Sequence, residues 1–219
     1  MHIPTSPTTF VDVLPFEEAL REALIPHPDY EVKDWLYVPN RYDEYRYVLG
    51  TRGKCPIICV GINPSTAAPN DLDPTLKSAQ RIALANGYDS FLMFNVYAQR
   101  ATRPDDMERE RNEWLHAENM KAFAYLLSIA GEKPAVWAAW GAIIEKRPYL
   151  ADCVRDMKEI ADRAGATWYH AGPISVKGHP HHPLYLKSNT PLELFDTTAY
   201  LRTLSNPERP QSHEKGKIP

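Results

Sequence analysis

Short apolar runs alternate with longer amphipathic segments along this chain. The clearest run is Ile-Ile-Cys-Val at residues 57–60, and its continuous apolar, β-branched character is typical of a strand buried on both faces of a parallel sheet. Similar runs at residues 91–94, 135–140 and 167–171 predict three further strands. Each run ends at a turn-forming or polar residue, so the chain should leave the sheet at these points.

The segments between these runs have the spacing and the end signals of helices. Asp73 can act as an N-cap before Pro74, which suits the first position of a helix. Residues 105–130 and 142–164 predict two longer helices, the second interrupted by a proline, and a capping box at residues 190–193 predicts the opening of a last helix. Strands alternating with helices of crossover length predict a three-layer α/β/α fold around a mainly parallel four-stranded sheet.

The flanks of this pattern differ from its centre. Residues 1–40 are rich in proline and predict a peripheral extension with one short helix at residues 16–25. Residues 41–204 form the predicted α/β domain, in which residues 42–49 have the composition of a strand at the sheet edge. Residues 205–219 are polar and predict a mobile tail.

Composition narrows the class of protein. The 219 residues are 43% hydrophobic, which is typical of a globular chain with one sizeable core. The formal net charge of −3 argues against indiscriminate coating of nucleic acid but leaves room for a local basic cleft. Three cysteines, no signal peptide and no apolar run of membrane-spanning length lead us to expect a cytoplasmic protein. We expect a monomer, because no oligomerisation surface stands out.

The chemistry-bearing residues follow the predicted strands. Asn63, Asn95, Trp140 and a loop with two His-Pro pairs at residues 178–183 come at four successive strand ends. Such ends share the edge of an open α/β sheet where ligands bind. The sequence has no glycine-rich phosphate loop, no serine elbow and no His/Cys group with metal spacing. We therefore predict no metal and no cofactor, because metal sites usually draw ligands from several elements.

These strand ends resemble the motifs of the uracil-DNA glycosylase superfamily. Gly-Ile-Asn-Pro at residues 61–64 is similar to the motif of mismatch-specific uracil/thymine-DNA glycosylases. Asn-Val-Tyr at residues 95–97 resembles the Asn-Val-Val segment of other branches, Ala-Trp-Gly at residues 139–141 resembles a strand end of the family, and His-Pro at residues 182–183 resembles its last motif. The ordered set resembles the branch known as domain of unknown function 1643.

The resemblance implies a monofunctional DNA glycosylase that flips out a modified or damaged pyrimidine and hydrolyses its N-glycosidic bond. In that family the asparagine corresponding to Asn63 positions the attacking water, and the histidine corresponding to His182 stabilises the departing base. Asp71 follows closely enough to assist Asn63, and His179 is a second candidate for the histidine. The base would be contacted by Ile62, Pro64, Ser65, Asn95 and Tyr97. The DNA would be contacted by Ser65, Thr66, Arg100, His179, His181, Leu184, Tyr185 and Lys187.

Small residues after the water-holding motif bear on the substrate. Strict uracil enzymes of the superfamily have an aromatic residue that blocks a 5-methyl group, whereas Ser65, Thr66 and Ala67 are small here. The hypothesis is a pocket open at pyrimidine C5, for mismatched thymine, for uracil, or for hydroxymethylated or glucosylated phage cytosine in antiviral defence. Two alternatives stay open: a non-catalytic module that binds a modified base, and a hydrolase or transferase of free nucleosides or nucleotides.

Each candidate also has an ordinary structural role. Asn95 suits a strand-end turn, His182 suits a capped loop, and Asp73 suits a helix cap. Arg100 and Lys187 could be solvated surface charges. The sequence leaves both readings open for these residues, and the discriminating observation is whether Asn63, Asn95 and His182 meet at one place.

Overall fold

A seven-stranded mixed sheet forms the centre of the structure, in the strand order β1-β2-β4-β3-β5-β6-β7. The computed structural model describes residues 1–205. β3 pairs in parallel with β4 and β5, and β5 pairs in parallel with β6, whereas β1, β2 and β7 add to the two sides in antiparallel fashion. The strands are β1 (Trp35–Val38), β2 (Val48–Thr51), β3 (Pro56–Gly61), β4 (Ser90–Asn95), β5 (Ala135–Ala138), β6 (Thr167–Ala171) and β7 (Leu192–Leu194).

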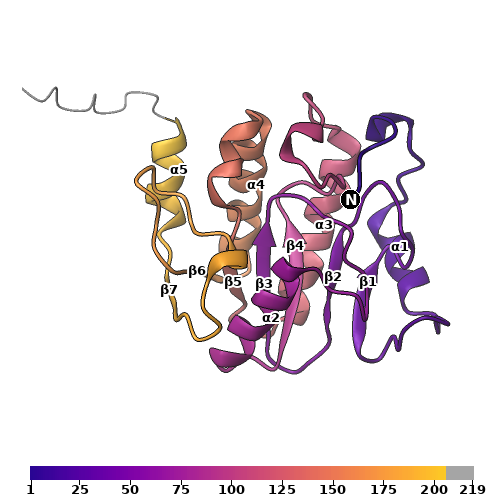
Figure 1. The fold of residues 1–219 in the computed structure, drawn as a ribbon, viewed down its shortest axis with the longest axis horizontal. Helices are drawn as coiled ribbons and strands as arrows, with labels where there is room; N and C mark the ends of the chain where they lie inside the picture. The colour runs from indigo at the N-terminus through magenta and orange to yellow at the C-terminus, as the bar shows by residue number, and fades with distance from the viewer. Residues whose placement is uncertain (206–219) are drawn as a thin grey trace, which may run out of the picture.

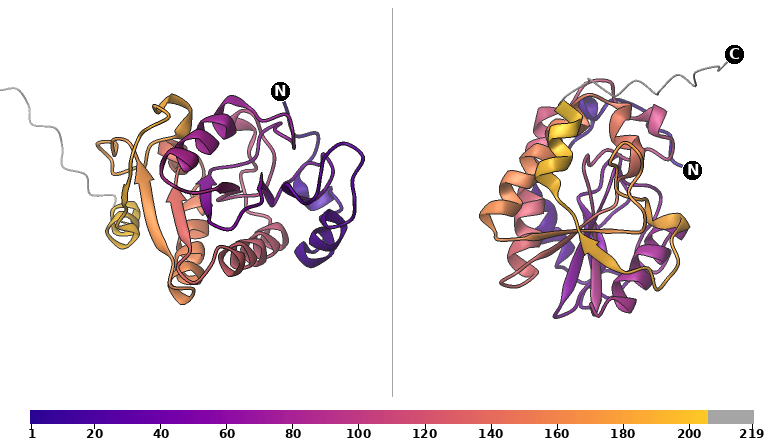
Figure 2. Two further views of the ribbon diagram at one scale, coloured as in Figure 1. Left: turned by 90° about the horizontal axis from the view of Figure 1, so that it is seen from below. Right: turned by 90° about the vertical axis from the view of Figure 1, so that its left-hand side faces the viewer.

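Helices cover both faces of this sheet, as the side view in Figure 2 shows. One face carries α2 (Pro74–Ala85) and the short 3-10 helix η4 (Pro183–Tyr185), which pack on each other. The other face carries α1 (Phe16–Ala23), α3 (Glu113–Ile129), α4 (Tyr149–Arg163) and α5 (Thr197–Ser205). The loops at the carboxyl ends of the parallel strands include the 3-10 helices η2 (Pro104–Asp106) and η3 (Gly141–Lys146), and η1 (Thr8–Phe10) lies near the N-terminus (Figure 1).

Alternation along the central strands builds the two cores. Ile58 and Val60 of β3 face the side of α3 and α4, whereas Ile57 and Cys59 face the side of α2. Every residue of β3 and β4 is buried, which is the reason for their continuous apolar sequences. The four predicted parallel strands are confirmed as β3, β4, β5 and β6.

Local signals in the sequence fix the ends of α2 and the break before α4. Asp73 Oδ1 accepts a hydrogen bond of 2.9 Å from the backbone N–H of Leu76, which confirms the predicted N-cap. Gly87 has a φ of 86° just beyond the end of α2, a conformation that glycine adopts without strain. Pro148 separates η3 from α4, as its missing N–H predicts.

The N-terminal part of the chain is more integrated than the sequence predicted. β1 lies within the predicted extension and forms one edge of the sheet. β2 lies between β1 and β4, so the strand predicted at the sheet edge from residues 42–49 is not an edge strand. It also begins only at Val48, where its pairing with β1 begins. α1 is shorter than the predicted helix at residues 16–25: it ends at Ala23, buries Phe16, Ala19 and Ala23, and leaves Leu24 exposed.

Two predicted helix boundaries are wrong. The capping box at residues 190–193 does not open a helix, because Leu192–Leu194 pairs with β6 as β7. α5 begins at Thr197, where Asp196 Oδ1 accepts 2.9 Å from the N–H of Ala199. α3 begins at Glu113, not near residue 105.

Most of the predicted mobile tail, residues 206–219, lies outside the described residues. No helix within residues 1–205 has both the length and the apolar character needed to cross a membrane.

Candidate functional site

A buried, unpaired side-chain amide lies at the carboxyl end of β4. Asn95 is 1% exposed, and neither its Nδ2 nor its Oδ1 has a hydrogen-bond partner among the described residues. Leaving a buried polar group unpaired costs about 1–3 kcal/mol. Both polar atoms of this one side chain are unpaired, and a ligand with an adjacent donor and acceptor would pair with both of them.

Gly61, at the end of β3, lies directly beside this amide. The two residues are opposite each other in the parallel register. A Cβ atom at position 61 would lie 3.1 Å from Asn95 Oδ1 and 2.6 Å from Cε of Met93. A side chain here would therefore crowd the amide, and glycine keeps the space next to Asn95 open. By the alternation of β4, Asn95 and Met93 point to the face that α2 covers.

The loop after β3 carries the second asparagine. Asn63 Nδ2 donates to the carbonyl oxygens of Ala101, at 2.5 Å, and of Pro64, at 3.3 Å. Its Oδ1 accepts no hydrogen bond from any residue in the described part of the chain. The donor side of this amide is therefore fixed, and its acceptor oxygen remains available at the sheet edge.

The same loop ends on the first turn of α2. Ser65 Oγ donates a short hydrogen bond to Asp73 Oδ2, while Asp73 Oδ1 caps the helix. One carboxylate thus joins the loop to the helix start. Because both oxygens have fixed donors, Asp73 holds a defined orientation beside the site.

Two buried arginines donate to backbone carbonyls of the loop after β3. Arg46 Nη1 donates 2.8 Å to the carbonyl of Ala67, and Arg100 Nη1 donates to the carbonyl of Ser65. Arg100 Nη2 also donates 3.2 Å to the hydroxyl of Tyr37. Burial lowers the pKa of Arg46 to about 9, and the neighbouring Arg100 adds to this shift. Both guanidinium groups remain charged at neutral pH, so they fix the loop and bring positive charge close to it.

His182 directly precedes η4, which packs on α2. Its Nδ1 accepts from the N–H of Leu184 at 3.4 Å, so the neutral ring carries its proton on Nε2. Burial lowers the pKa of His182, although the negative charge of Asp73 opposes the shift. Its Cβ lies 3.6 Å from where a Cβ of Gly141 would be, at the end of β5. Ser78 Oγ donates 2.7 Å to the carbonyl of Pro183 and anchors η4 on α2.

The two candidate histidines are in different environments. His179 is 1% exposed, its Nδ1 lies 3.1 Å from the hydroxyl of Tyr200, and its Nε2 lies 3.3 Å from Oε1 of Glu145. Trp140 Nε1 donates 3.0 Å to the same tyrosine hydroxyl. His179 therefore belongs to a network with α5 and η3, whereas His182 is the histidine on which the charge of Asp73 acts.

One family model matches this chain. It covers residues 46–184 and is described as Protein of unknown function (DUF1643). The chain belongs to this family. The matched segment runs from the buried Arg46 to Leu184 and includes Asn63, Asn95 and His182, whereas Tyr37 and Tyr200 lie outside it. No curated protein and no solved structure matches the chain. This description names no activity, so the function proposed below rests on the geometry of the site.

Several residues expected at the site face elsewhere. Tyr97 is turned into the core, where its hydroxyl donates 2.6 Å to Glu108 Oε2 and accepts from the N–H of Asn112 at 2.9 Å. Ile62 is buried in the same core, on the face opposite to α2. Asp71 is exposed in a turn, paired through its backbone with Ala68.

The residues expected to contact DNA divide into two groups. Arg100 and His179 are buried and engaged in the contacts given above, so neither side chain lies on the rim. His181 is half-buried, and its Nδ1 lies 2.9 Å from the carbonyl of His182. The exposed or half-exposed remainder is Ser65, Thr66, Leu184, Tyr185 and Lys187.

Three features of the site were not assigned a role from the sequence. Arg46 and Ser78 support the loop and η4, and Asn119 Nδ2 donates 3.0 Å to the backbone carbonyl of Asn95. The available signal for Arg46 was its position between Tyr45 and Tyr47, just before the apolar start of β2, because a buried charge needs an acceptor. Nothing in the local sequence distinguishes Ser78 or Asn119.

Proposed function

We propose that the protein is a monofunctional DNA glycosylase that flips a modified or damaged pyrimidine out of DNA and hydrolyses its N-glycosidic bond. The observation that carries the proposal is the buried amide of Asn95, which has a free donor and a free acceptor next to the open space at Gly61. A pyrimidine edge offers the complementary acceptor and donor side by side. Binding such a base would satisfy both atoms at once.

The other groups of the site suit the cleavage step. The bond breaks through a cationic, oxocarbenium-like sugar, and the leaving base takes away negative charge. Asn63 Oδ1 can hold the attacking water, because its Nδ2 is already fixed on Ala101. The neutral imidazole of His182 can donate from Nε2 to the oxygen of the departing base. Asp73 is better placed than the exposed Asp71 to orient these groups, and the assisting role of Asp71 stays a prediction.

The order of the motifs along the chain supports the proposal of a member of the uracil-DNA glycosylase superfamily. The loop after β3 carries Gly-Ile-Asn-Pro, β4 ends in asparagine, and a His-Pro pair follows β6. Ser65, Thr66 and Ala67 follow the motif in the region where strict uracil enzymes have an aromatic residue, and the hydroxyl of Ser65 donates to Asp73. These small side chains favour a substrate with a substituent at C5, such as mismatched thymine or hydroxymethylated or glucosylated cytosine.

The test is a panel of duplexes that carry uracil, a thymine mismatch, 5-hydroxymethylcytosine or glucosylated hydroxymethylcytosine, followed by alkaline cleavage at abasic sites. We expect strand breaks at one or more modified bases, lost in Asn63→Ala and in Asn95→Ala, while DNA affinity changes little in Asn63→Ala. Asn189→Ala is the matched control, because Asn189 is exposed. Release of uracil alone would reject the open C5 pocket.

Other outcomes distinguish the alternatives. Tight binding of a modified duplex without any abasic site would identify a non-catalytic binding module. Cleavage of free nucleosides in the same assay, without cleavage in DNA, would identify a nucleoside hydrolase. Base release that persists in both asparagine variants would contradict the assignment of this site.

A further inference from the structure

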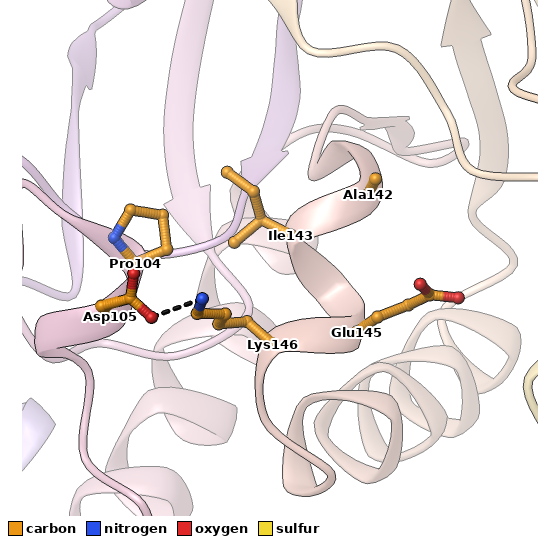
Figure 3. A pocket seen from close by; sticks show the side chains of 6 residues that line it. All are labelled: Pro104, Asp105, Ala142, Ile143, Glu145 and Lys146. Carbon is orange, nitrogen blue, oxygen red and sulfur yellow. Dashed lines mark ion pairs between the residues drawn. The ribbon is translucent and has the colours of Figure 1, made fainter.

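Open space alone does not mark a binding position in this protein. The hollow between η2 and η3 is lined by Pro104, Asp105, Ala142, Ile143, Glu145 and Lys146 (Figure 3). It is open to solvent, and the charges of Asp105 and Lys146 already pair with each other. The position beside Asn95 is the reverse case, because it is filled and yet leaves two buried polar atoms without partners among the described residues.

The side chain that fills this position is Met93. Its terminal methyl carbon, Cε, lies 2.6 Å from the point where a Cβ of residue 61 would be, and Asn95 Oδ1 lies 3.1 Å from the same point. Apart from the chain neighbours of Gly61, the next nearest heavy atom is the backbone oxygen of Phe94, at 4.0 Å. None of these three atoms belongs to α2, so the methyl of Met93, and not the helix, occupies the space over Gly61.

The methyl group of Met93 is a poor neighbour for the amide of Asn95. Asn95 Oδ1 is a buried acceptor without a donor, and a methyl group has no polar hydrogen to offer it. Both side chains are buried, so bulk water does not reach this oxygen either. A base that presents a donor here would replace an apolar contact by a hydrogen bond.

Methionine is a side chain that can give way. It is unbranched, has three rotatable bonds and adapts to irregular gaps in protein cores. The backbone of Met93 is held on both sides, because it pairs with Leu49 of β2 and with Cys59 of β3. The side chain can therefore change rotamer without any movement of the sheet.

The sheet under the methyl group of Met93 carries small residues. Gly61 has no side chain, and Ala139, just beyond β5, has only a methyl group. The N–H of Ala139 donates 2.9 Å to the carbonyl of Val60, which places Ala139 beside the end of β3. Neighbouring strands are about 4.8 Å apart, so these two residues form a floor on which a flat ring can lie with its edge toward Asn95.

We propose that Met93 is a base-contacting residue that closes this position in the free protein. Its methyl leaves the space over Gly61 when a base pairs with Asn95, and the thioether then packs against the ring of that base. The inference rests on the proposed function for the identity of the ligand as a pyrimidine base. Met93 acts in binding and takes no part in the cleavage step.

The test follows the methyl NMR signals of methionine and isoleucine in the full chain during titration with free uracil, thymine and 5-hydroxymethylcytosine. Met107 and Met157 are buried elsewhere and serve as internal references. We expect the Met93 signal to shift with at least one base, while the two references and Ile143 in the open hollow stay unchanged. A base that shifts the side-chain amide signals of Asn95 but not Met93 overturns the proposal. A shift of Ile143 in place of Met93, or no shift with any base, overturns it as well.

Met93→Leu removes the methyl group from the space over Gly61 with little change of the fold. Leucine ends one atom short of Cε, and exchange of leucine and methionine is well tolerated in cores. Base binding should become about three- to tenfold tighter, because no side chain has to change rotamer. Met157→Leu in α4 is the matched control and should leave the affinity unchanged. Equal affinity of Met93→Leu and the native protein contradicts the closing role.

A double variant locates the base over Gly61. Gly61→Ala places a Cβ against both Met93 Cε and Asn95 Oδ1, so it should lower stability and abolish base binding. Adding Met93→Leu removes the first of these contacts, so stability should recover while binding stays lost. Binding that returns in the double variant would show that the base does not occupy this space.

Base release from DNA separates this inference from the proposed function. A response of Met93 to free bases without any base release supports the binding role of Met93 and refutes the glycosylase. Base release together with an unchanged Met93 signal supports the glycosylase and refutes the role of Met93.

Discussion

Replacing Asn95 by leucine should stabilise the protein and abolish base release. The two side chains branch at the same atom and have similar shapes, so the substitution removes polarity with little change of volume. In the ligand-free protein neither polar atom of Asn95 has a partner among the described residues. The unpaired amide therefore lowers the free energy of unfolding, and leucine removes this destabilising contribution.

The magnitude follows from the burial. Asn95 is 1% exposed, so its amide loses its water on folding and gains no hydrogen bond in return. An unsatisfied buried group of this kind costs about 1–3 kcal/mol. We expect Asn95→Leu to raise the free energy of unfolding by about this amount. For a chain of this size the melting temperature should rise by roughly 2–12 °C.

The assay is urea denaturation followed by circular dichroism, with the matched substitution Asn112→Leu. Asn112 is also buried, but its Oδ1 accepts from the N–H groups of Trp114 and Leu115 at 3.0 and 3.2 Å, and its Nδ2 donates 3.0 Å to Thr8. This variant should lose about 1–2 kcal/mol as its helix cap disappears. If Asn95→Leu is destabilised as much as Asn112→Leu, the Asn95 amide is satisfied in the free protein, and the argument for a ligand fails.

Three further predictions each compare a variant at the site with a control or an alternative. Asp73→Ala should lower the free energy of unfolding by about 1 kcal/mol in urea titrations, because the helix cap is lost, and it should reduce base release. Asp71→Ala, at an exposed position, should change the unfolding free energy by less than about 0.5 kcal/mol and keep the activity, and the opposite ranking would restore Asp71 as the assisting carboxylate. Burial lowers the pKa of His182 below the value of about 6.5 in the unfolded chain, so its contribution to stability should be complete above that pH and fall as the pH decreases toward the folded pKa. In His182→Asn the urea midpoint should depend less on pH between pH 5 and 8 than in the native protein. An unchanged pH dependence would count against a buried neutral ring. Arg100→Met should lower the unfolding free energy by about 1–3 kcal/mol by leaving a loop carbonyl unpaired, whereas Arg103→Met at an exposed position should change it little, and equal effects would disprove the clamp.

The sequence determined the elements whose signals are local. Continuous apolar runs predicted β3, β4 and β5, because a strand buried on both faces needs no polar positions. Asp73 and Gly87 marked the ends of α2, since an N-cap and a left-handed residue act within one helical turn. β1 was not predicted because its apolar residues stand in a proline-rich segment without a sustained pattern. β7 has only three residues, and its pairing with β6 outweighs the capping-box signal at residues 190–193.

The sequence also determined that Asn63 and Asn95 come at strand ends, and parallel strands bring such ends to one edge. Only the tertiary structure decided which side chains meet there. It placed His182 just before η4, which Ser78 anchors on α2, and His179 in the network around Tyr200, and it buried Arg100, which by sequence alone could be a surface charge. Contacts between segments tens of residues apart depend on how helices and loops pack on the sheet, and no local pattern of residues encodes that packing.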